Sequence, residues 1–192
     1  MAAGAGAGAR TRRTPLSLKG RALALLAQRE HSAGELRRKL LRHARAETAR
    51  NAASATEGRP CAGASDEGDD ATADDALARV DAVIDWLRGQ RYLSDERFVE
   101  SRVHARASRY GNVRIRQELA QHGVSLSPEA AQTLRDSELE RATDVWRRKF
   151  GTLPADAAER ARQSRFLAQR GFSAAVISRV MRNAGSQGDE EI

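Results

Sequence analysis

The stretch LAQREHSAGEL at residues 26–36 recurs near the other end of the chain as LAQRGFSAAVI at residues 167–177, and this repeat indicates how the chain is organised. In the first copy, Ser32 and Glu35 have the spacing of a capping box, which marks the start of a helix. Apolar residues then recur three or four positions apart, as they do on the buried face of a helix. Each copy therefore predicts the end of one helix, a turn, and the start of the next helix.

A third and weaker copy is ARASRYGNVRI at residues 105–115, so the same helix-turn-helix corner is predicted three times. Each repeat has roughly 45 residues once a polar insertion is set aside, which is near the lower limit for burying a core alone. Neighbouring repeats are therefore expected to stack. We predict three three-helix repeats, at residues 17–93, 94–136 and 137–184.

Apolar stripes at helical spacing also cover the segments between these corners, and no segment alternates as a strand would. Val80, Val83, Ile84 and Leu87 form one such stripe, which ends at Gly89. The predicted fold class is all-α, with tandem helix-turn-helix-like repeats in an elongated, curved stack.

Three segments lack the apolar residues that ordering requires, namely a leader at 1–16, an insertion at 45–75 and a tail at 185–192. The insertion has no Leu, Ile, Val or aromatic residue and carries 3 Arg against 8 acids. We expect all three segments to be disordered. The acidic insertion is interpreted either as a solubilising linker or as a competitor with an anionic ligand for the basic part of the chain.

The charge of the chain favours a polyanionic partner. Its 33 Lys and Arg outnumber 26 Asp and Glu, the net charge is +7 and the pI is near 10.6. Because the insertion carries a net charge of −5, the remaining residues carry +12. Most of the cations are Arg, whose planar guanidinium binds phosphate in a bidentate manner. A codon bias that enriches Arg and Ala is the alternative explanation.

The sequence offers little support for an enzyme. It has no G-x-x-x-x-G-K-[ST] phosphate loop, and its only cysteine, Cys61, lies in a polar stretch. His31 and Glu35 stand four residues apart, but no third metal ligand accompanies them. Asp81 and Asp85 share a helix face and are interpreted as a solvated pair. We expect no catalytic residue, no cofactor and no metal.

The same features indicate where the protein works. A single cysteine excludes a disulfide within the chain, which favours a reducing compartment. The N-terminal residues lack the apolar run of a signal peptide, and no window approaches 18 consecutive apolar residues. We therefore expect a cytoplasmic monomer without a membrane partner.

Three further motifs stand out, namely YLSDERF at residues 92–98, the YG-x-x-x-I-R-x-EL pattern at 110–119 and RFLAQRGFS at 165–173. Together they resemble the RecX family, the bacterial regulators of the RecA recombinase. The resemblance extends over residues 17–181 and departs from the usual pattern in the acidic insertion. It implies a non-enzymatic protein that binds along the groove of the RecA filament on DNA and inhibits strand exchange and ATP hydrolysis. Direct contact with single-stranded or double-stranded DNA is a further implication.

Clusters of basic residues on the predicted helices are the candidate contacts with the filament or with DNA. They are Arg37, Arg38, Lys39, Arg114, Arg116, Arg147, Arg148, Lys149, Arg162 and Arg165. The alternative function is a self-standing DNA-binding protein whose helix-turn-helix corners enter the major groove. Such a protein concentrates basic residues on one recognition helix, whereas these residues are spread over all three repeats.

Overall fold

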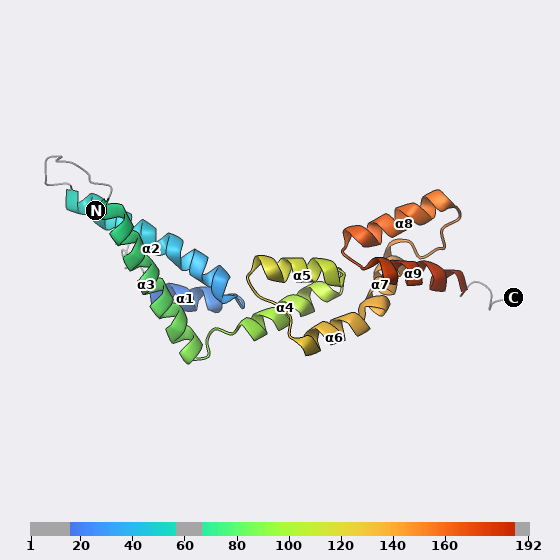
Figure 1. The fold of residues 1–192 in the computed structure, drawn as a ribbon, viewed down its shortest axis with the longest axis horizontal. Coiled ribbons are helices and arrows are strands. Elements are labelled where there is room, and N and C mark those ends of the chain that lie inside the picture. Colours follow the sequence, from blue (N-terminus) through green and yellow to red (C-terminus); the bar gives the residue numbers. More distant parts are fainter. Residues whose placement is uncertain (1–15, 57–66, 187–192) are drawn as a thin grey trace, which may run out of the picture.

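The structure is a computed structural model that describes residues 16–56 and 67–186, and within these ranges it contains nine α-helices and no β-strand (Figure 1). The prediction of an all-α fold is confirmed for this part of the chain. The helices follow one another along a single long axis, so the molecule is elongated and bent. They are α1 (Leu18–Leu26), α2 (Ala33–Thr56), α3 (Glu67–Gly89), α4 (Asp95–Ala107), α5 (Asn112–Gln121), α6 (Pro128–Asp136), α7 (Glu138–Lys149), α8 (Ala157–Gln169) and α9 (Ala174–Ser186).

Three separate apolar cores divide these helices into a first bundle (α1–α3), a second bundle (α4–α6) and a third bundle (α7–α9). The second core is the smallest, with only five buried residues. A core of this size leaves its helices dependent on neighbouring bundles. The central buried side chains are Leu36, Leu40 and Leu87 in the first bundle, Phe98, Ile115 and Leu119 in the second, and Leu167, Phe172 and Val180 in the third.

The predicted disorder of residues 45–75 is wrong at both ends of that insertion. Helix α2 continues to Thr56 and α3 begins at Glu67, while residues 57–66 lie outside the described ranges. Alanine has the highest helix propensity, and lengthening an existing helix costs far less than starting one. Ala44 and Ala76, which flank the insertion, are both fully buried in the first core, so each end of the insertion continues a helix that is already packed.

The other two segments that were predicted to be disordered lie largely outside the described residues. Residues 1–15 of the leader and 187–192 of the tail are not described, and neither is Cys61. At the end of the chain, α9 continues through Ser186. The prediction that the tail begins at residue 185 is therefore wrong by two residues, because the backbone of a helix can continue beyond the last residue of its apolar pattern.

All three copies of the repeated stretch form a turn between two helices, as predicted. The corner lies between α1 and α2 in the first bundle, between α4 and α5 in the second, and between α8 and α9 in the third. The predicted capping box is half formed. Ser32 Oγ accepts a hydrogen bond from Glu35 N at 3.1 Å, but the Glu35 carboxylate accepts from Arg29 and Lys39.

The second and third bundles meet where the α4–α5 corner touches the α8–α9 corner. Gly111 N donates to Arg170 O at 2.9 Å, and Val113 N donates to Gly171 O at 3.1 Å. A Cβ atom on Gly111 would lie 2.2 Å from Gly171 O, a distance that no real contact allows. Gly171 itself has a φ of +81°, in the left-handed region that favours glycine. Two glycines thus permit direct contact between the backbones of two bundles.

Glu138, at the start of α7, strengthens this junction. Its buried carboxylate accepts hydrogen bonds from Asn112 N at 3.1 Å and from Ser173 N at 3.4 Å. These amides lie at the N-termini of α5 and α9, where backbone donors have no partner within their own helix. A negative charge there is also favoured by the dipoles of both helices. One carboxylate therefore caps one helix from each bundle.

Arg141, one turn further along α7, donates hydrogen bonds to carbonyl groups at the C-terminal ends of neighbouring helices. Its guanidinium donates to Ala107 O at 3.1 Å, to Tyr110 O at 2.9 Å and to Leu134 O at 2.9 Å. These carbonyls lie where α4 and α6 end, at the negative poles of those helices. Burial lowers the pKa of the Arg141 guanidinium. Helix α7 is thereby fixed to the second bundle.

The first bundle joins the second through its own corner. Ser32 Oγ donates to His122 O at 2.9 Å, and Ala33 N donates to Asp95 Oδ1 at 2.8 Å. Asp95 therefore supplies a hydrogen-bond acceptor to the N-terminus of α2 from the neighbouring bundle. In each bundle the repeated corner is thus the place of contact with another bundle.

We expect the Gly111→Ala substitution to lower the free energy of unfolding by about 3 kcal/mol, because the added methyl group collides with the backbone at Gly171. Chemical denaturation followed by circular dichroism measures this loss. Gly89→Ala is the matched control, because no atom lies within 4 Å of its Cβ position, and it should be neutral or slightly stabilising. Equal stability of the two variants would contradict the close contact between the corners.

Candidate functional site

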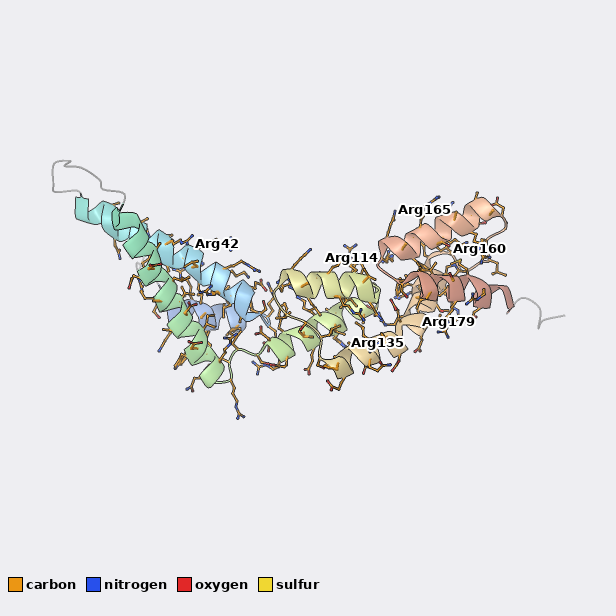
Figure 2. All side chains as sticks on the ribbon, viewed as in Figure 1. Arg42, Arg114, Arg135, Arg160, Arg165 and Arg179 are labelled. Atoms are coloured by element: carbon orange, nitrogen blue, oxygen red, sulfur yellow. The ribbon has the colours of Figure 1, made fainter. Side chains whose placement is uncertain are left out.

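The ten basic residues predicted as contacts lie on four helices, α2, α5, α7 and α8, in all three bundles. Nine of the ten are exposed and Lys39 is half-buried. Figure 2 shows Arg42, Arg114 and Arg165 along the upper edge of the molecule, on α2, α5 and α8, and Arg135 and Arg179 on its lower side. These three helices thus give one edge of the molecule a row of cations, which we call the basic edge.

Two of the three predicted residues on α2 are already paired within the first bundle. Arg37 donates to both carboxylate oxygens of Asp81 at 2.6 Å, and this hydrogen bonding lowers the pKa of Asp81. Lys39 lies 3.1 Å from Glu35. Both charges are therefore partly neutralised where they stand. Arg38 forms no hydrogen bond or salt bridge with the described residues and has the more accessible charge.

The predicted residues of α5 differ in how firmly they are held. The Arg114 guanidinium lies 4.5 Å from the centre of the Tyr110 ring and donates to Gln169 O at 3.4 Å. It is therefore oriented across the junction of the second and third bundles. Arg116 is exposed and has no hydrogen bond or salt bridge within the described ranges.

The remaining five predicted residues belong to the third bundle. Arg148 donates to Ser108 O at 2.8 Å, at the end of α4, and so contacts the second bundle. Arg147 lies beside an apolar groove. The other three, Lys149, Arg162 and Arg165, form no hydrogen bond or salt bridge with any described residue. Their charges are available to a partner.

Three basic residues were not predicted from the sequence. Arg109 and Arg170 stand in two of the repeated corners, where the second and third bundles touch, and Arg42 of the first bundle lies on the basic edge. Arg109 and Arg170 both lie within copies of the repeated stretch, and this was the signal that could have found them. The sequence does not show that the two corners touch, so the two arginines could not be recognised as neighbours.

A polar groove of about 740 Å³ lies between α5 and α8, beside the contact between the corners. Arg102, Arg106 and Arg114 line it together with glutamine side chains. Glu118 is its one acidic lining residue, and it pairs with Arg102 at 3.2 Å and Arg106 at 3.0 Å. Two arginines share one carboxylate, so the groove keeps an excess of positive charge. This arrangement suits an anionic partner.

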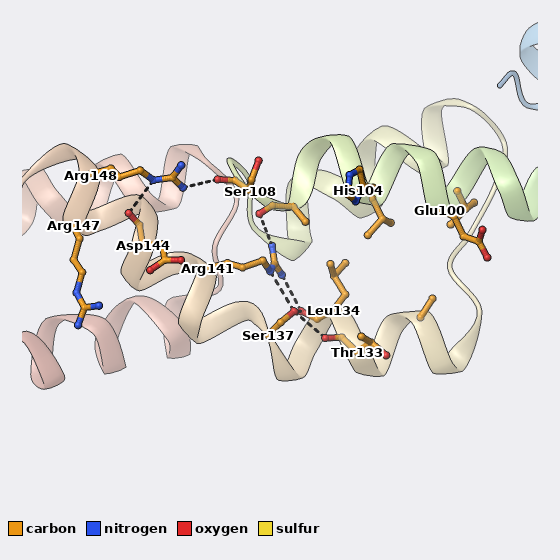
Figure 3. A pocket seen from close by; sticks show the side chains of 14 residues that line it. Glu100, His104, Ser108, Thr133, Leu134, Ser137, Arg141, Asp144, Arg147 and Arg148 are labelled. Atoms are coloured by element: carbon orange, nitrogen blue, oxygen red, sulfur yellow. Dashed lines mark hydrogen bonds between the residues drawn. The ribbon is translucent and has the colours of Figure 1, made fainter. Parts of the chain in front are cut away.

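A second groove is apolar and faces a different side of the second bundle. It has a volume of about 960 Å³ and lies between α4 on one side and α6 and α7 on the other (Figure 3). Val99, Val103 and Leu134 line its length, and Arg141 lies at one end with its guanidinium directed toward Leu134 and Ser137. The basic residues of the groove are concentrated near α7, where Arg148 reaches Ser108.

The pair His31 and Glu35, considered above as metal ligands, belongs instead to a buried ionic cluster beside the first corner. His31 Nδ1 donates to Arg29 O at 2.9 Å, which leaves Nε2 to accept from Lys39 Nζ at 3.0 Å. Burial lowers the pKa of His31, so its imidazole is neutral near pH 7. Within the described ranges, no group of three or more His, Cys, Asp or Glu residues is placed to hold a metal ion.

Glu35 is the carboxylate on which this cluster is centred. Burial by itself would raise the pKa of Glu35, but hydrogen bonds from Arg29 and Lys39 outweigh it and lower the pKa to about 2. The carboxylate contacts His122 of the second bundle as well, at 3.9 Å. The ionised form of Glu35 therefore stabilises the corner of the first bundle, which lies against the second bundle.

The fold and this surface together define a helical-repeat protein whose extended basic edge suits a long anionic partner. Models of the second and third three-helix domains of RecX match residues 94–127 and 136–181. The chain is 44% identical over 185 residues to the regulatory protein RecX of Ralstonia nicotianae, covering 94% of this chain and 98% of that protein. The chain belongs to the RecX family.

Two further comparisons support this assignment. The regulatory protein RecX of Leptothrix cholodnii is also 44% identical, over 181 residues that cover 93% of this chain and 96% of that protein. A crystal structure of a regulatory protein RecX superposes with a TM-score of 0.54 at 18% identity, covering 86% of this chain and 71% of that chain. That structure supports the fold. No helix among the described residues has the length and apolar character needed to cross a membrane.

We expect the stability that Glu35 contributes to be complete above its ordinary pKa of 4.5 and to be lost as the pH falls toward 2. The Glu35→Gln variant should lose about 3 kcal/mol at pH 7, and the gap to the wild type should narrow with acid. Denaturation at a series of pH values measures both effects. Glu47→Gln removes an exposed carboxylate on the same helix and should change little. A gap for Glu35→Gln that is independent of pH would contradict the depressed pKa.

Proposed function

We propose that this chain regulates the RecA recombinase, mainly as an inhibitor, by binding the RecA–DNA filament through its basic edge. Membership in the RecX family supports the choice of partner. The single structural observation that supports the mode of binding is the row of cations on α2, α5 and α8, in three successive bundles. An extended row of this kind fits a partner whose negative charges also continue along an axis.

The physical basis of the binding is the exchange of small ions for protein cations. A nucleoprotein filament holds condensed counterions along its phosphates, and Lys or Arg side chains release them on binding. Arg116, Arg162 and Arg165 suit this role because none is hydrogen-bonded or ion-paired with the described residues. Their guanidinium groups are exposed to solvent, so the phosphates of a partner can replace the water and counterions around them. Binding through them should weaken as salt increases.

The geometry argues against the alternative, a self-standing reader of the major groove. A helix-turn-helix protein reads bases with the N-terminal residues of its second helix. Here the N-terminus of α5 is covered by the α8–α9 corner. The Glu138 carboxylate caps the N-termini of both α5 and α9. The N-terminus of α2 is bonded to Asp95. In all three corners, the N-terminus that such a protein would present to DNA is therefore used for packing between or within bundles.

The experiment that tests the proposal measures ATP hydrolysis by RecA on single-stranded DNA, with and without this protein, at several salt concentrations. We expect the wild type to inhibit hydrolysis, and the inhibition to decrease as salt increases. The Arg42→Glu/Arg165→Glu variant reverses two charges of the basic edge, and we expect it to need at least tenfold more protein for half inhibition.

The matched control is Arg135→Glu/Arg179→Glu, which makes the same change in net charge on the lower side of the molecule. It should inhibit nearly as well as the wild type, and circular dichroism should give the same helicity for all three proteins. Equal loss in both variants would assign the effect to net charge alone. Failure of the wild type to inhibit would reject the proposed regulation.

A further inference from the structure

A small pocket beside the contact between the corners has a charge pattern that the fold does not explain. Its volume is about 440 Å³, and it lies between the turn after α4, the end of α7 and the end of α8. Four cations line it, Arg109, Arg148, Lys149 and Arg170, with the rings of Tyr110 and Phe166. No acidic residue is among the residues that line it. We call it the corner pocket.

Two of the four cations are held in place. Arg148 Nη2 donates to Ser108 O at 2.8 Å and its Nε donates to Asp144 O at 3.2 Å. Arg170 Nη1 donates to Arg109 O at 3.3 Å, and its guanidinium lies 4.6 Å from the centre of the Phe166 ring. These bonds also satisfy carbonyls near the end of α4, which is a structural role. They use only some of the donors of each guanidinium, which has five.

The other two cations have no such structural role. The side chains of Arg109 and Lys149 are exposed and form no hydrogen bond or salt bridge with the described residues. Like charges around one cavity repel one another, and no carboxylate in the lining relieves that repulsion. An anion placed among them would be attracted by all four cations at once. The two anchored guanidinium groups are preorganised for it, so little side-chain entropy is lost on binding.

We propose that the corner pocket binds a phosphate group of a nucleic-acid backbone. A guanidinium group offers paired N–H donors that match two oxygens of a phosphate group. The four cations of the pocket carry more positive charge than one carboxylate would neutralise, which favours phosphate as the ligand. The polar groove lined by Arg102, Arg106 and Arg114 lies beside the same corner contact and offers a second cationic site. Two neighbouring sites fit a ligand with repeated phosphates better than a single free nucleotide. This inference rests on the proposed function, since it assigns direct nucleic-acid contact to the same regulator.

The test is the affinity of the full chain for a fluorescently labelled single-stranded oligonucleotide, measured by anisotropy over a series of salt concentrations. The Arg109→Gln/Lys149→Gln variant removes the two cations that the fold does not use. We expect its affinity to fall about tenfold. The slope of log K against log salt should also decrease by about 0.7, the value for one lost phosphate contact on a single strand.

The matched control is Arg179→Gln/Arg182→Gln, which removes two exposed charges from α9, outside the pocket. It should retain the wild-type slope. A fall in affinity and slope that is the same for both variants overturns the proposal, and so does an unchanged slope for Arg109→Gln/Lys149→Gln. Titration calorimetry with ATP as the probe separates the sources of phosphate. Loss of ATP binding in that variant with unchanged DNA binding would overturn the nucleic-acid assignment in favour of a free nucleotide.

The RecA assay described above separates failure of the pocket from failure of the proposed function. If the wild type inhibits RecA but its oligonucleotide affinity does not depend on Arg109 and Lys149, the pocket assignment alone is wrong. If the wild type binds the oligonucleotide through these residues but leaves RecA hydrolysis unchanged, the pocket assignment stands and the regulatory function is rejected.

Discussion

The contact between Gly111 and Gly171 sets the arrangement of the second and third bundles. Because neither residue has a side chain, the α4–α5 and α8–α9 corners approach until backbone amides of one bond carbonyls of the other. This approach places α5 beside α8 and creates the polar groove on one flank and the corner pocket on another. The polar groove and the corner pocket, which we propose as binding surfaces, are therefore products of the junction, and no single bundle could form them.

The same constraint limits what the corners can do. Helix N-termini carry unpaired amides and a positive dipole end, which suits them to bind anions directly. In this molecule the N-termini of α5 and α9 are occupied by one carboxylate, that of Glu138. At these two corners, binding of an anion would therefore rely on side chains rather than on the amides of the helix N-termini. The strength of such contacts depends on the charge and spacing of the phosphates more than on the base sequence.

The sequence predicted the helical fold and the three corners, because apolar spacing and capping residues are local signals. It failed at residues 45–56 and 67–75, where alanine-rich segments continue helices whose nearest buried residues, Ala44 and Ala76, stand just outside the insertion. It found exposed cations on the helices but could not tell that Arg37 is paired with Asp81. Arg109 and Arg170 were missed because their proximity depends on a contact between bundles, which no local pattern records.

The long pair formed by α2 and α3 has a mechanical consequence. Helix α2 contains 24 residues, so it extends about 36 Å from the corner that attaches it to the second bundle. Figure 1 shows that its far end projects beyond α1. The pair extends as a long arm from a junction that consists of the bonds made by Ser32 and Ala33, the ion pairs Arg97–Glu30 and Arg88–Asp95, and the short link from α3 to α4. A rotation of about 5° at this junction would move the far end of α2 by about 3 Å.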